Sequence, residues 1–166
     1  FAGRCYNATA LAQKLRTKIE LSNPDHIVEV LAKGFLAEGY DFLKQIDGAF
    51  SLAIYQSSEK RLTLINDIYG FYPLFYAKGE SAIAFCNEYE PLLELPFVDK
   101  AINKRAVADI VQFGLVTGNQ TLLSGIQQMP PATVLTYDAI GIQMNTYSLQ
   151  NHPEPIQVTL QEASRQ

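Results

Sequence analysis

The sequence has little of what most recognisable catalytic and metal sites require. Its 166 residues include two cysteines, two histidines and no tryptophan. The cysteines, Cys5 and Cys86, form no CxxC pair, and neither has a histidine at the spacing of metal ligands. There is also no phosphate-binding glycine loop and no catalytic-triad pattern. We therefore expect neither a metal ion nor another cofactor.

The sequence also lacks long runs of basic residues and long runs of apolar residues. The formal net charge is −4, and the lysines and arginines are scattered, which argues against a nucleic-acid partner. No apolar run approaches the ~18 residues of a membrane span, and the first residues lack the anatomy of a signal peptide. These absences predict a cytoplasmic protein with two reduced thiols, and a single structural disulfide is the alternative.

What is present is enough apolar material for one well-packed domain. The chain is 48% hydrophobic and has the length of a single domain. Residues 151–155 have the composition of a linker, and residues 158–166 resemble the first turns of a helix. Because the chain also starts without a methionine, we expect both ends to be cuts through a longer protein. The expected division is a domain over residues 1–150, followed by a linker and the start of a second domain over residues 151–166.

Apolar spacing and capping residues predict several helices. Asn7 and Asn103 are expected to cap helices over residues 8–15 and 104–113. The sequence Asn23-Pro24-Asp25 is typical of a helix start, because Asn can cap, Pro fits the first turn and Asp faces the positive helix end. Shorter helices are expected over residues 40–45 and 88–95, and a short strand over residues 19–21.

The centre of the sequence is rich in strand patterns. Hairpins are predicted from three pairs of strands, over residues 50–55 with 61–66, 72–77 with 82–86, and 133–137 with 142–147. Contiguous hairpins imply antiparallel sheets. Unbroken apolar runs such as Leu64-Ile65 indicate strands that are covered on both faces. We therefore expect sheets inside and helices outside.

Residues 66–77 form the most distinctive stretch. The Asp-x-x-Gly spacing of Asp67 and Gly70 suits an Asx-type turn with the glycine at positive φ, after which Pro73 restarts a strand. We expect this turn role for Asp67 and Gly70 rather than a catalytic one. No basic groove accompanies the nearby tyrosines, so they are expected to be core and interface aromatics rather than a stacking platform.

Five stretches in this order carry a resemblance. They are Ala2-Gly3-Arg4-Cys5-Tyr6-Asn7, Gln45-Ile46-Asp47-Gly48-Ala49-Phe50-Ser51-Leu52-Ala53, residues 67–76, Phe85-Cys86-Asn87-Glu88, and Gly125-Ile126-Gln127-Gln128-Met129-Pro130-Pro131 with Tyr147. With them the chain resembles the glutamine amidotransferase (class II, N-terminal-nucleophile) domain of the asparagine synthetase family. The corresponding family segments are Asn-Gly-Glu-Ile-Tyr-Asn, Leu-Asp-Gly-x-Phe-Ala-Phe-Ala, Asp-x-x-Gly-x-x-Pro-Leu-Tyr-Tyr, Phe-Ala-Ser-Glu, and Gly-Val-x-x-Leu-Pro-Pro-Gly with a closing Tyr-Trp.

The resemblance implies a fold and a set of partners. The fold is α+β, a four-layer αββα sandwich of two antiparallel sheets of the N-terminal-nucleophile hydrolase type, here N-terminally incomplete. In the family this domain hydrolyses glutamine and passes ammonia to a C-terminal, ATP-dependent synthetase domain of the same chain. The implied partners are therefore glutamine and that synthetase domain. The phosphate-binding Ser-Gly-Gly-x-Asp-Ser loop of the synthetase domain is absent, so this chain alone should not use ATP.

The resemblance also implies which active-site groups are altered. The family nucleophile is an N-terminal cysteine whose own α-amine is the general base, whereas this chain begins with Phe1, so no catalytic residue is assigned. Gly3 stands where the family has its oxyanion-hole glycine, but Ala2 replaces the neighbouring asparagine and Arg4 replaces a glutamate. Asp25 is the nearest candidate for the aspartate that binds the substrate α-amino group, and a solvated helix-start aspartate is the alternative.

Other reactive side chains have plainer interpretations. Cys5 with His26 could be proposed as an internal nucleophile, but Cys5 matches an apolar strand position, which favours core packing. Glu88 and Glu90 could pose as paired carboxylates, but exposed helix glutamates are the expected result.

The sequence therefore predicts a glutaminase-type domain of an asparagine synthetase-like protein of asparagine biosynthesis, with its activity lost. The alternative is a non-catalytic docking domain that supports a partner synthetase domain, and a third interpretation is an unrelated αββα hydrolase. Absent upstream strands would leave sheet edges unpaired, so we also expect the segment to fold with its missing N-terminal part or as a homo-oligomer with another copy.

Overall fold

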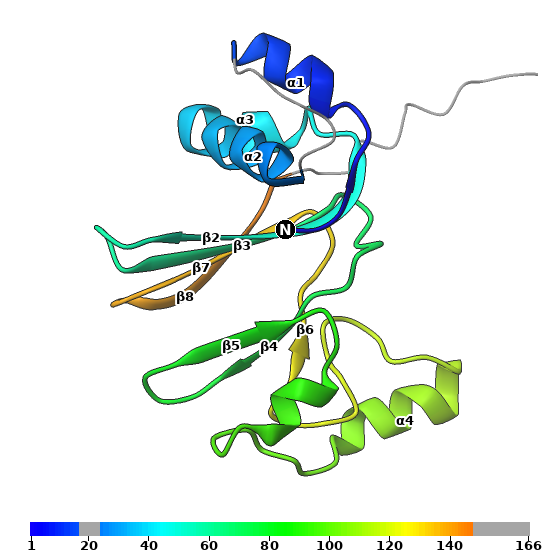
Figure 1. Cartoon of the computed structure of the whole chain (residues 1–166). Coiled ribbons are helices and arrows are strands. Elements are labelled where there is room, and N and C mark those ends of the chain that lie inside the picture. The colour runs from blue at the N-terminus through cyan, green and yellow to red at the C-terminus, as the bar shows by residue number, and fades with distance from the viewer. Residues whose placement is uncertain (17–23, 148–166) are drawn as a thin grey trace, which may run out of the picture.

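The computed structural model describes residues 1–16 and 24–147, and these form two antiparallel sheets with helices outside them (Figure 1). The larger sheet has five strands in the order β1-β2-β3-β7-β8, and the smaller has three in the order β5-β4-β6. The strands of the larger sheet are β1 (Ala2–Cys5), β2 (Gly48–Gln56), β3 (Arg61–Asn66), β7 (Thr133–Asp138) and β8 (Gly141–Thr146). Those of the smaller sheet are β4 (Phe75–Lys78), β5 (Ile83–Cys86) and β6 (Gln127–Gln128). The expected α+β sandwich of antiparallel sheets is confirmed.

The middle strands of the larger sheet are covered on both faces, as their unbroken apolar runs predict. Neighbouring residues of one strand point to opposite faces of a sheet. Ile65 of β3 and Val134 of β7 belong to the core beneath the helices, whereas their neighbours Leu64 and Leu135 belong to the core between the sheets. All four side chains are at most 1% exposed.

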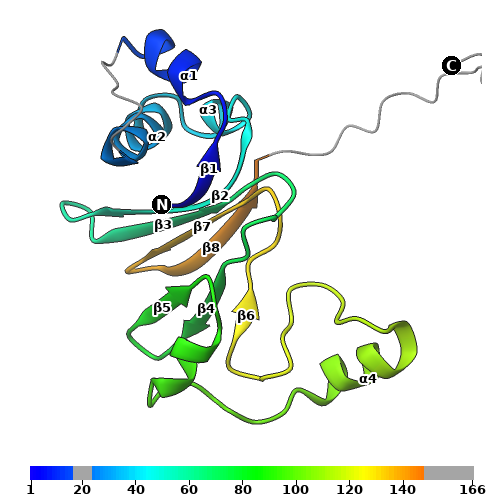
Figure 2. The same ribbon diagram turned by 45° about the vertical axis from the view of Figure 1, so that its right-hand side comes forward.

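Three helices cover the outer face of the larger sheet (Figures 1 and 2). They are α1 (Ala8–Lys14), α2 (Pro24–Glu38) and α3 (Tyr40–Leu43). Their buried side chains share one core with Phe50, Leu52 and Ile54 of β2, which alternate along that strand. No helix in the described part of the chain is long and apolar enough to cross a membrane.

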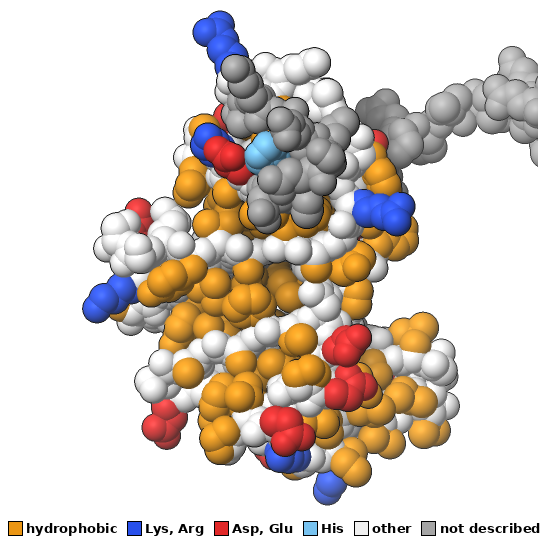
Figure 3. Space-filling model, in the orientation of Figure 1, with side chains coloured by type: hydrophobic (Ala, Val, Ile, Leu, Met, Phe, Trp, Pro, Cys, Tyr) orange, Lys and Arg blue, Asp and Glu red, His pale blue; other side chains and the backbone are white. Residues whose placement is uncertain are grey.

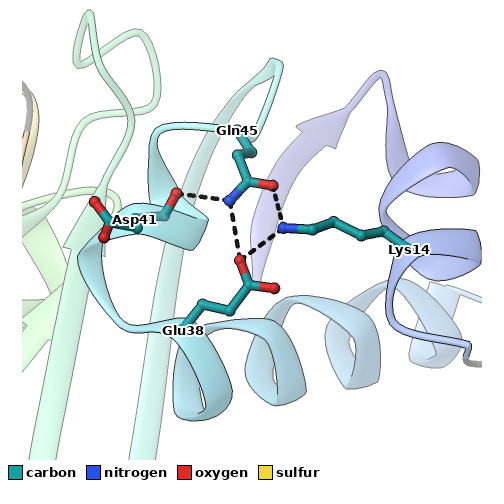
Figure 4. Close-up of polar contacts among 4 residues, drawn as sticks. All are labelled: Lys14, Glu38, Asp41 and Gln45. Carbon is teal, nitrogen blue, oxygen red and sulfur yellow. Dashed lines mark hydrogen bonds and ion pairs between the residues drawn. The ribbon is translucent and has the colours of Figure 1, made fainter.

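A polar network joins the three helices at the protein surface (Figure 4). Lys14 Nζ of α1 lies 2.7 Å from Glu38 Oε2 of α2 and donates to Gln45 Oε1 at 2.7 Å. Gln45 Nε2 donates to Glu38 Oε2 at 3.0 Å and to the Asp41 carbonyl oxygen of α3 at 2.8 Å. These hydrogen bonds lower the pKa of Glu38, with the bond from Lys14 as the largest cause.

The outer face of the smaller sheet carries a thinner layer. The short 3₁₀ helix η1 (Glu90–Glu94) lies there, and its Leu92 shares a small core with Ala77, Val98 and Ile126. The longer helix α4 (Lys104–Phe113) lies to the side of this sheet in both views (Figures 1 and 2). The four layers are therefore helices, five-stranded sheet, three-stranded sheet and η1.

The helix ends show where local sequence signals are reliable. Asn103 caps α4, since its side chain accepts hydrogen bonds from the Arg105 and Ala106 amides, and α4 ends at Gly114 with a φ of 77°. Asn7 precedes α1 as predicted, but its side chain makes no cap bond. Instead it accepts from the Asp47 amide at 3.0 Å and donates to the Gln45 carbonyl at 2.7 Å, so it ties the chain before β2 to the end of β1.

The strand predictions need correction at two places, and some predictions fall on residues that the structure does not describe. The strand expected over residues 72–77 begins only at Phe75, because the Tyr72 amide donates to Asp67 instead of a neighbouring strand and Pro73 has no N–H. The two-residue strand β6 was not expected, since it is too short to show a pattern. The strand predicted over residues 19–21, the Asn23 cap and the linker over residues 151–155 lie outside the described residues.

Candidate active site

The first strand places Gly3 against β2 at very short range. Gly3 pairs in register with Phe50 and has a φ of 116°, in the region that side chains rarely adopt. A Cβ atom at Gly3 would collide with the Ala49 carbonyl oxygen and would lie 2.6 Å from Phe50 Cα. Gly48 of β2 shows the converse contact, because a Cβ there would collide with the Arg4 carbonyl oxygen and lie 3.1 Å from Cys5 Cα.

A cavity of about 250 Å³ opens beside Gly3, between the two sheets. Ala2 lines this cavity from β1, and Phe85 and Cys86 line it from β5 of the other sheet. The remaining lining residues are Phe1, Ser51, Leu52, Ala53, Leu74 and Asn87. We call it the inter-sheet cavity. Of the two residues of the oxyanion-hole segment predicted from the sequence, Ala2 therefore lines a concave site and Gly3 follows it in β1.

Asn87 holds the two sheets together at the inter-sheet cavity. Its Nδ2 donates to Ser51 Oγ of β2 at 2.8 Å and to the Pro73 carbonyl oxygen at 2.7 Å. Sequence analysis gave Asn87 no role beyond its place in a matching stretch. A cross-sheet bond of this kind depends on two residues 36 positions apart, so no local pattern could have revealed it.

The buried carboxylate of Asp67 organises the backbone next to this site. Asp67 is fully buried, and both of its oxygens are used. Oδ1 accepts from the Tyr69 amide at 2.9 Å and from the Phe71 amide at 3.2 Å. Oδ2 accepts from the Phe50 amide at 3.0 Å and from the Tyr72 amide at 3.2 Å. The predicted Asx turn is confirmed, and the bond to Phe50 extends it to a second strand.

The same turn collects three stretches that are far apart in the sequence. The Asp67 amide donates to the Phe50 carbonyl at 3.0 Å, and the Asp67 carbonyl accepts from the Ala132 amide at 2.8 Å. Asn66 Nδ2 donates to the Met129 carbonyl at 3.2 Å, and the Tyr147 hydroxyl donates to the Asn66 carbonyl at 2.8 Å. We call this set of bonds the Asp67 junction. These bonds bring the sequence motifs at residues 47–50, 66–77 and 129–131 into contact in the folded structure.

The Asp67 junction also reaches the candidate oxyanion glycine. Phe50 is held through both its amide and its carbonyl by Asp67, and Phe50 is the register partner of Gly3. The position of the Gly3 backbone is therefore fixed through β2 by a buried carboxylate. Burial, and to a smaller extent the nearby Asp67 charge, raise the pKa of the Tyr147 hydroxyl.

Asp25 and Cys5 are the remaining candidate residues, and Cys5 does not line the inter-sheet cavity. Asp25 is the second residue of α2, and its role in substrate binding remains a prediction. Cys5 packs against the helix-side core, with its Sγ 3.5 Å from Asn7 Oδ1, and burial raises the pKa of its thiol. A thiol of raised pKa is protonated at neutral pH and is a poor nucleophile, which supports the packing role.

Both cysteines are free, Cys5 on β1 and Cys86 on β5. Glu88 and Glu90 are both exposed, as expected for surface carboxylates. Of the three nearby tyrosines, Tyr76 is buried, while Tyr69 and Tyr72 are exposed. Among residues 1–16 and 24–147, no group of three acidic, histidine or cysteine side chains could hold a metal ion.

Two antiparallel sheets that enclose a cavity beside a glycine-containing edge strand define the class of the protein. The fold is similar to that of a solved glutamine phosphoribosylpyrophosphate amidotransferase from Bacillus subtilis, with a TM-score of 0.56 and 16% identity. That likeness covers 89% of this chain and 28% of the solved chain. The class is the N-terminal-nucleophile fold of the glutamine amidotransferases.

The family is more specific. A family model described as "Glutamine amidotransferase domain" matches residues 1–148. The chain is 24% identical over 148 residues to asparagine synthetase [glutamine-hydrolyzing] 3 of Bacillus subtilis (strain 168). This alignment covers 89% of this chain and 24% of that protein. The chain is also 29% identical over 118 residues to asparagine synthetase [glutamine-hydrolyzing] 2 of the same organism. This alignment covers 70% of this chain and 16% of that protein. The chain belongs to the glutamine amidotransferase family and is a class II domain of the asparagine synthetase kind.

Proposed function

We propose that this domain is the glutamine-handling, ammonia-donating part of an asparagine synthetase-like protein, with glutaminase activity that is weak or lost. The chain spans about a quarter or less of the two asparagine synthetases named above. The reaction, substrate and synthetase partner are therefore proposed by likeness to these proteins. The observation that carries the weakened activity is Ala2, which presents a methyl group to the inter-sheet cavity.

The reaction needs two hydrogen-bond donors at the point where charge develops. Attack of a thiolate on the glutamine amide forms a tetrahedral oxyanion, which then expels ammonia and leaves an acyl-enzyme for water to hydrolyse. We assign one donor to the Gly3 amide. The second donor would be an asparagine side chain at position 2, and Ala2 cannot supply it. Loss of one such donor costs about 2.7–4 kcal/mol, or a factor of about 10²–10³ in rate.

The inter-sheet cavity suits a small, partly polar substrate. Ala53, Leu74 and Phe85 are apolar lining residues, and Ser51 and Asn87 add polar groups. We propose that the glutamine side chain enters here, and that Asp25 at the start of α2 binds the substrate α-amino group.

The decisive experiment restores the donor in the full-length protein. Glutamate release from glutamine would be measured for the wild type, for Ala2→Asn, and for Ala2→Leu. Leucine is close to asparagine in size but has no N–H, so it controls for filling the cavity. We expect Ala2→Asn to raise the rate by about 10²–10³ and Ala2→Leu to leave it unchanged. Wild-type turnover equal to that of the Bacillus subtilis relatives would contradict the proposal.

A second candidate function is a docking domain without catalysis. It is favoured by Ala2, because a domain that only docks needs no oxyanion donor at the cavity, and the exposed apolar side chains of α4 offer a surface for docking. In that case the full-length protein would use free ammonium but not glutamine for its condensation reaction, and Ala2→Asn would not restore glutamine use. The same assay therefore separates the two functions.

A further inference from the structure

Helix α4 and the chain on either side of it expose an unusual number of large apolar side chains. Val111 is 83% exposed and Ile102 is 68% exposed. The whole set, which we call the α4 face, consists of Ile102, Val107, Ile110, Val111, Phe113, Leu115 and Leu122. Hydrophobic side chains gather at the lower right of Figure 3, where Figure 1 places α4. Contiguous apolar surface of this kind on a folded domain indicates an interaction site.

The helix is held by its ends rather than by its apolar side. Only Ala106 of α4 is a buried hydrophobic residue. Besides its cap bonds, Asn103 donates through Nδ2 to Gln120 Oε1 and the Thr121 carbonyl, both at 3.2 Å. Beyond the other end, the chain folds back to the middle of the helix, where Asp109 Oδ2 accepts from the Thr117 hydroxyl at 2.6 Å and from the Thr117 amide at 3.1 Å. Helices of about this length are marginal alone in water, so these bonds present the α4 face in a defined orientation.

A mostly apolar groove adjoins the α4 face. It has a volume of about 390 Å³ and lies between the smaller sheet and residues 116–123. Its lining residues are Phe75, Tyr89, Val116, Gln120, Thr121, Leu122, Leu123 and Gln128. Leu122 belongs to both the groove and the α4 face, so the two form one surface with a ridge and a hollow.

We infer that the α4 face and its groove are the docking surface for a synthetase-type domain of the same polypeptide. This inference rests on the proposed function, which places the chain in a longer asparagine synthetase-like protein. About three quarters of the first relative lies outside the matched part, which covers 24% of it. A further domain of that size can cover the exposed side chains, and interfaces between domains of one chain typically bury about 600–1,500 Å².

The polar side of α4 supplies a matched control for the test. Gln112 is exposed and lies directly beside Val111, but it shares the side of the helix that carries Arg105 and Asp109. Val111→Glu places a charge in the proposed interface, whereas Gln112→Glu places the same charge on the polar side. In a free helix both changes would have similar small effects, because both side chains point into water.

The experiment measures hydrogen exchange of the α4 amides in the full-length protein. We expect slow exchange in the wild type and in Gln112→Glu, and exchange at least about 10-fold faster in Val111→Glu, because an unpaired charge buried in the interface opposes docking. Chemical cross-links from Lys104 should reach the synthetase-type domain. Molar mass from light scattering should be the same for all three proteins.

Three results would overturn the inference. The first is fast α4 exchange in the wild type, or equal exchange in the two variants. The second is protection that rises with concentration together with a doubled mass, which would assign the surface to a second copy of the chain. The third is a set of Lys104 cross-links confined to residues 149–166, which would assign it to this chain's own C-terminal segment. None of these depends on glutaminase activity, so the outcome is independent of the Ala2→Asn assay.

Discussion

At the scale of single residues, Asp67 has the most consequences for the rest of the fold. Its two carboxylate oxygens each accept two backbone amides, and one of these belongs to a different strand. The sequence spacing predicted the turn but not the bond to Phe50, because that bond depends on tertiary structure. A side chain that serves local and long-range bonds at once is a structural residue, even though it lies close to the candidate site.

Replacement of Asp67 by asparagine tests this role. The variant keeps the shape of the side chain, but in either orientation its NH₂ group faces two backbone N–H donors. Because those donors are buried, we expect a loss of about 2–4 kcal/mol in the free energy of unfolding, measured by urea denaturation. The control is Asp99→Asn, since Asp99 is exposed and accepts a single amide, from Ala101 at 2.9 Å. A loss of less than about 1 kcal/mol in Asp67→Asn would refute the role.

Tyr147 offers a prediction that depends on pH. The variant Tyr147→Phe removes the hydroxyl bonded to the Asn66 carbonyl and should cost about 1–2 kcal/mol at pH 7. The folded protein raises the pKa of Tyr147 above its ordinary value of 10.0. The contribution of this hydroxyl is therefore complete below pH 10 and is lost as the pH rises further, because only the unfolded chain ionises. Wild type and variant should converge in stability above that pH, whereas Tyr55→Phe, at an exposed site, should match the wild type throughout.

At the scale of elements, sequence-based prediction succeeded where the interactions are local in the sequence and failed where the partners are far apart in it. The helix α4 was predicted with its cap and its end, because Asn103 and Gly114 act within one turn. The strand expected from residue 72 begins only at Phe75, because the Tyr72 amide donates to Asp67 and Pro73 has no N–H to donate. The Asn7 side chain was also assigned wrongly, since its partners lie some 40 residues away, before β2. The cavity beside Ala2 could not be predicted from local patterns, since two sheets form it.

The contacts among α1, α2 and α3 should weaken in acid. Glu38 joins these helices, and its pKa is lowered in the folded state by the hydrogen bonds from Lys14 and Gln45. A lowered pKa means that the contribution is present above the ordinary glutamate pKa of 4.5 and disappears as the pH falls below it. The variant Glu38→Gln should therefore melt at a slightly lower temperature than the wild type at pH 7, and at the same temperature near pH 3.

The measurement is a series of melting curves recorded between pH 3 and pH 7. Glu80→Gln, in the exposed hairpin between β4 and β5, is the control and should match the wild type at every pH. A constant gap between Glu38→Gln and the wild type across this range would show that the carboxylate charge is not the cause. The contribution should also shrink with added salt, because the network lies at the surface.

At the scale of the whole molecule, the two sheets differ in how completely they are covered. The larger sheet has helices on one face and the smaller sheet on the other, whereas the smaller sheet has mainly η1 on its outer face. The unbroken apolar strands and the helices predicted sheets inside and helices outside, and the family resemblance implied four layers, but neither predicted that the fourth layer would be thin or that α4 would expose an apolar face. Helical periodicity predicts an apolar side for α4, but it does not say whether that side is covered. Only the arrangement in space separates a core helix from an interface helix.

The paired glycines of β1 and β2 have a consequence for inferring activity from sequence. Gly3 and Gly48 each fill the only space that the facing backbone leaves, and Gly3 also needs its positive φ. A domain that had stopped hydrolysing glutamine would still be obliged to keep both glycines in order to fold. Gly3 is thus required by the scaffold, and its presence carries no information about turnover. Ala2, which lines the inter-sheet cavity, is therefore the position whose replacement tests the weakened activity that we propose.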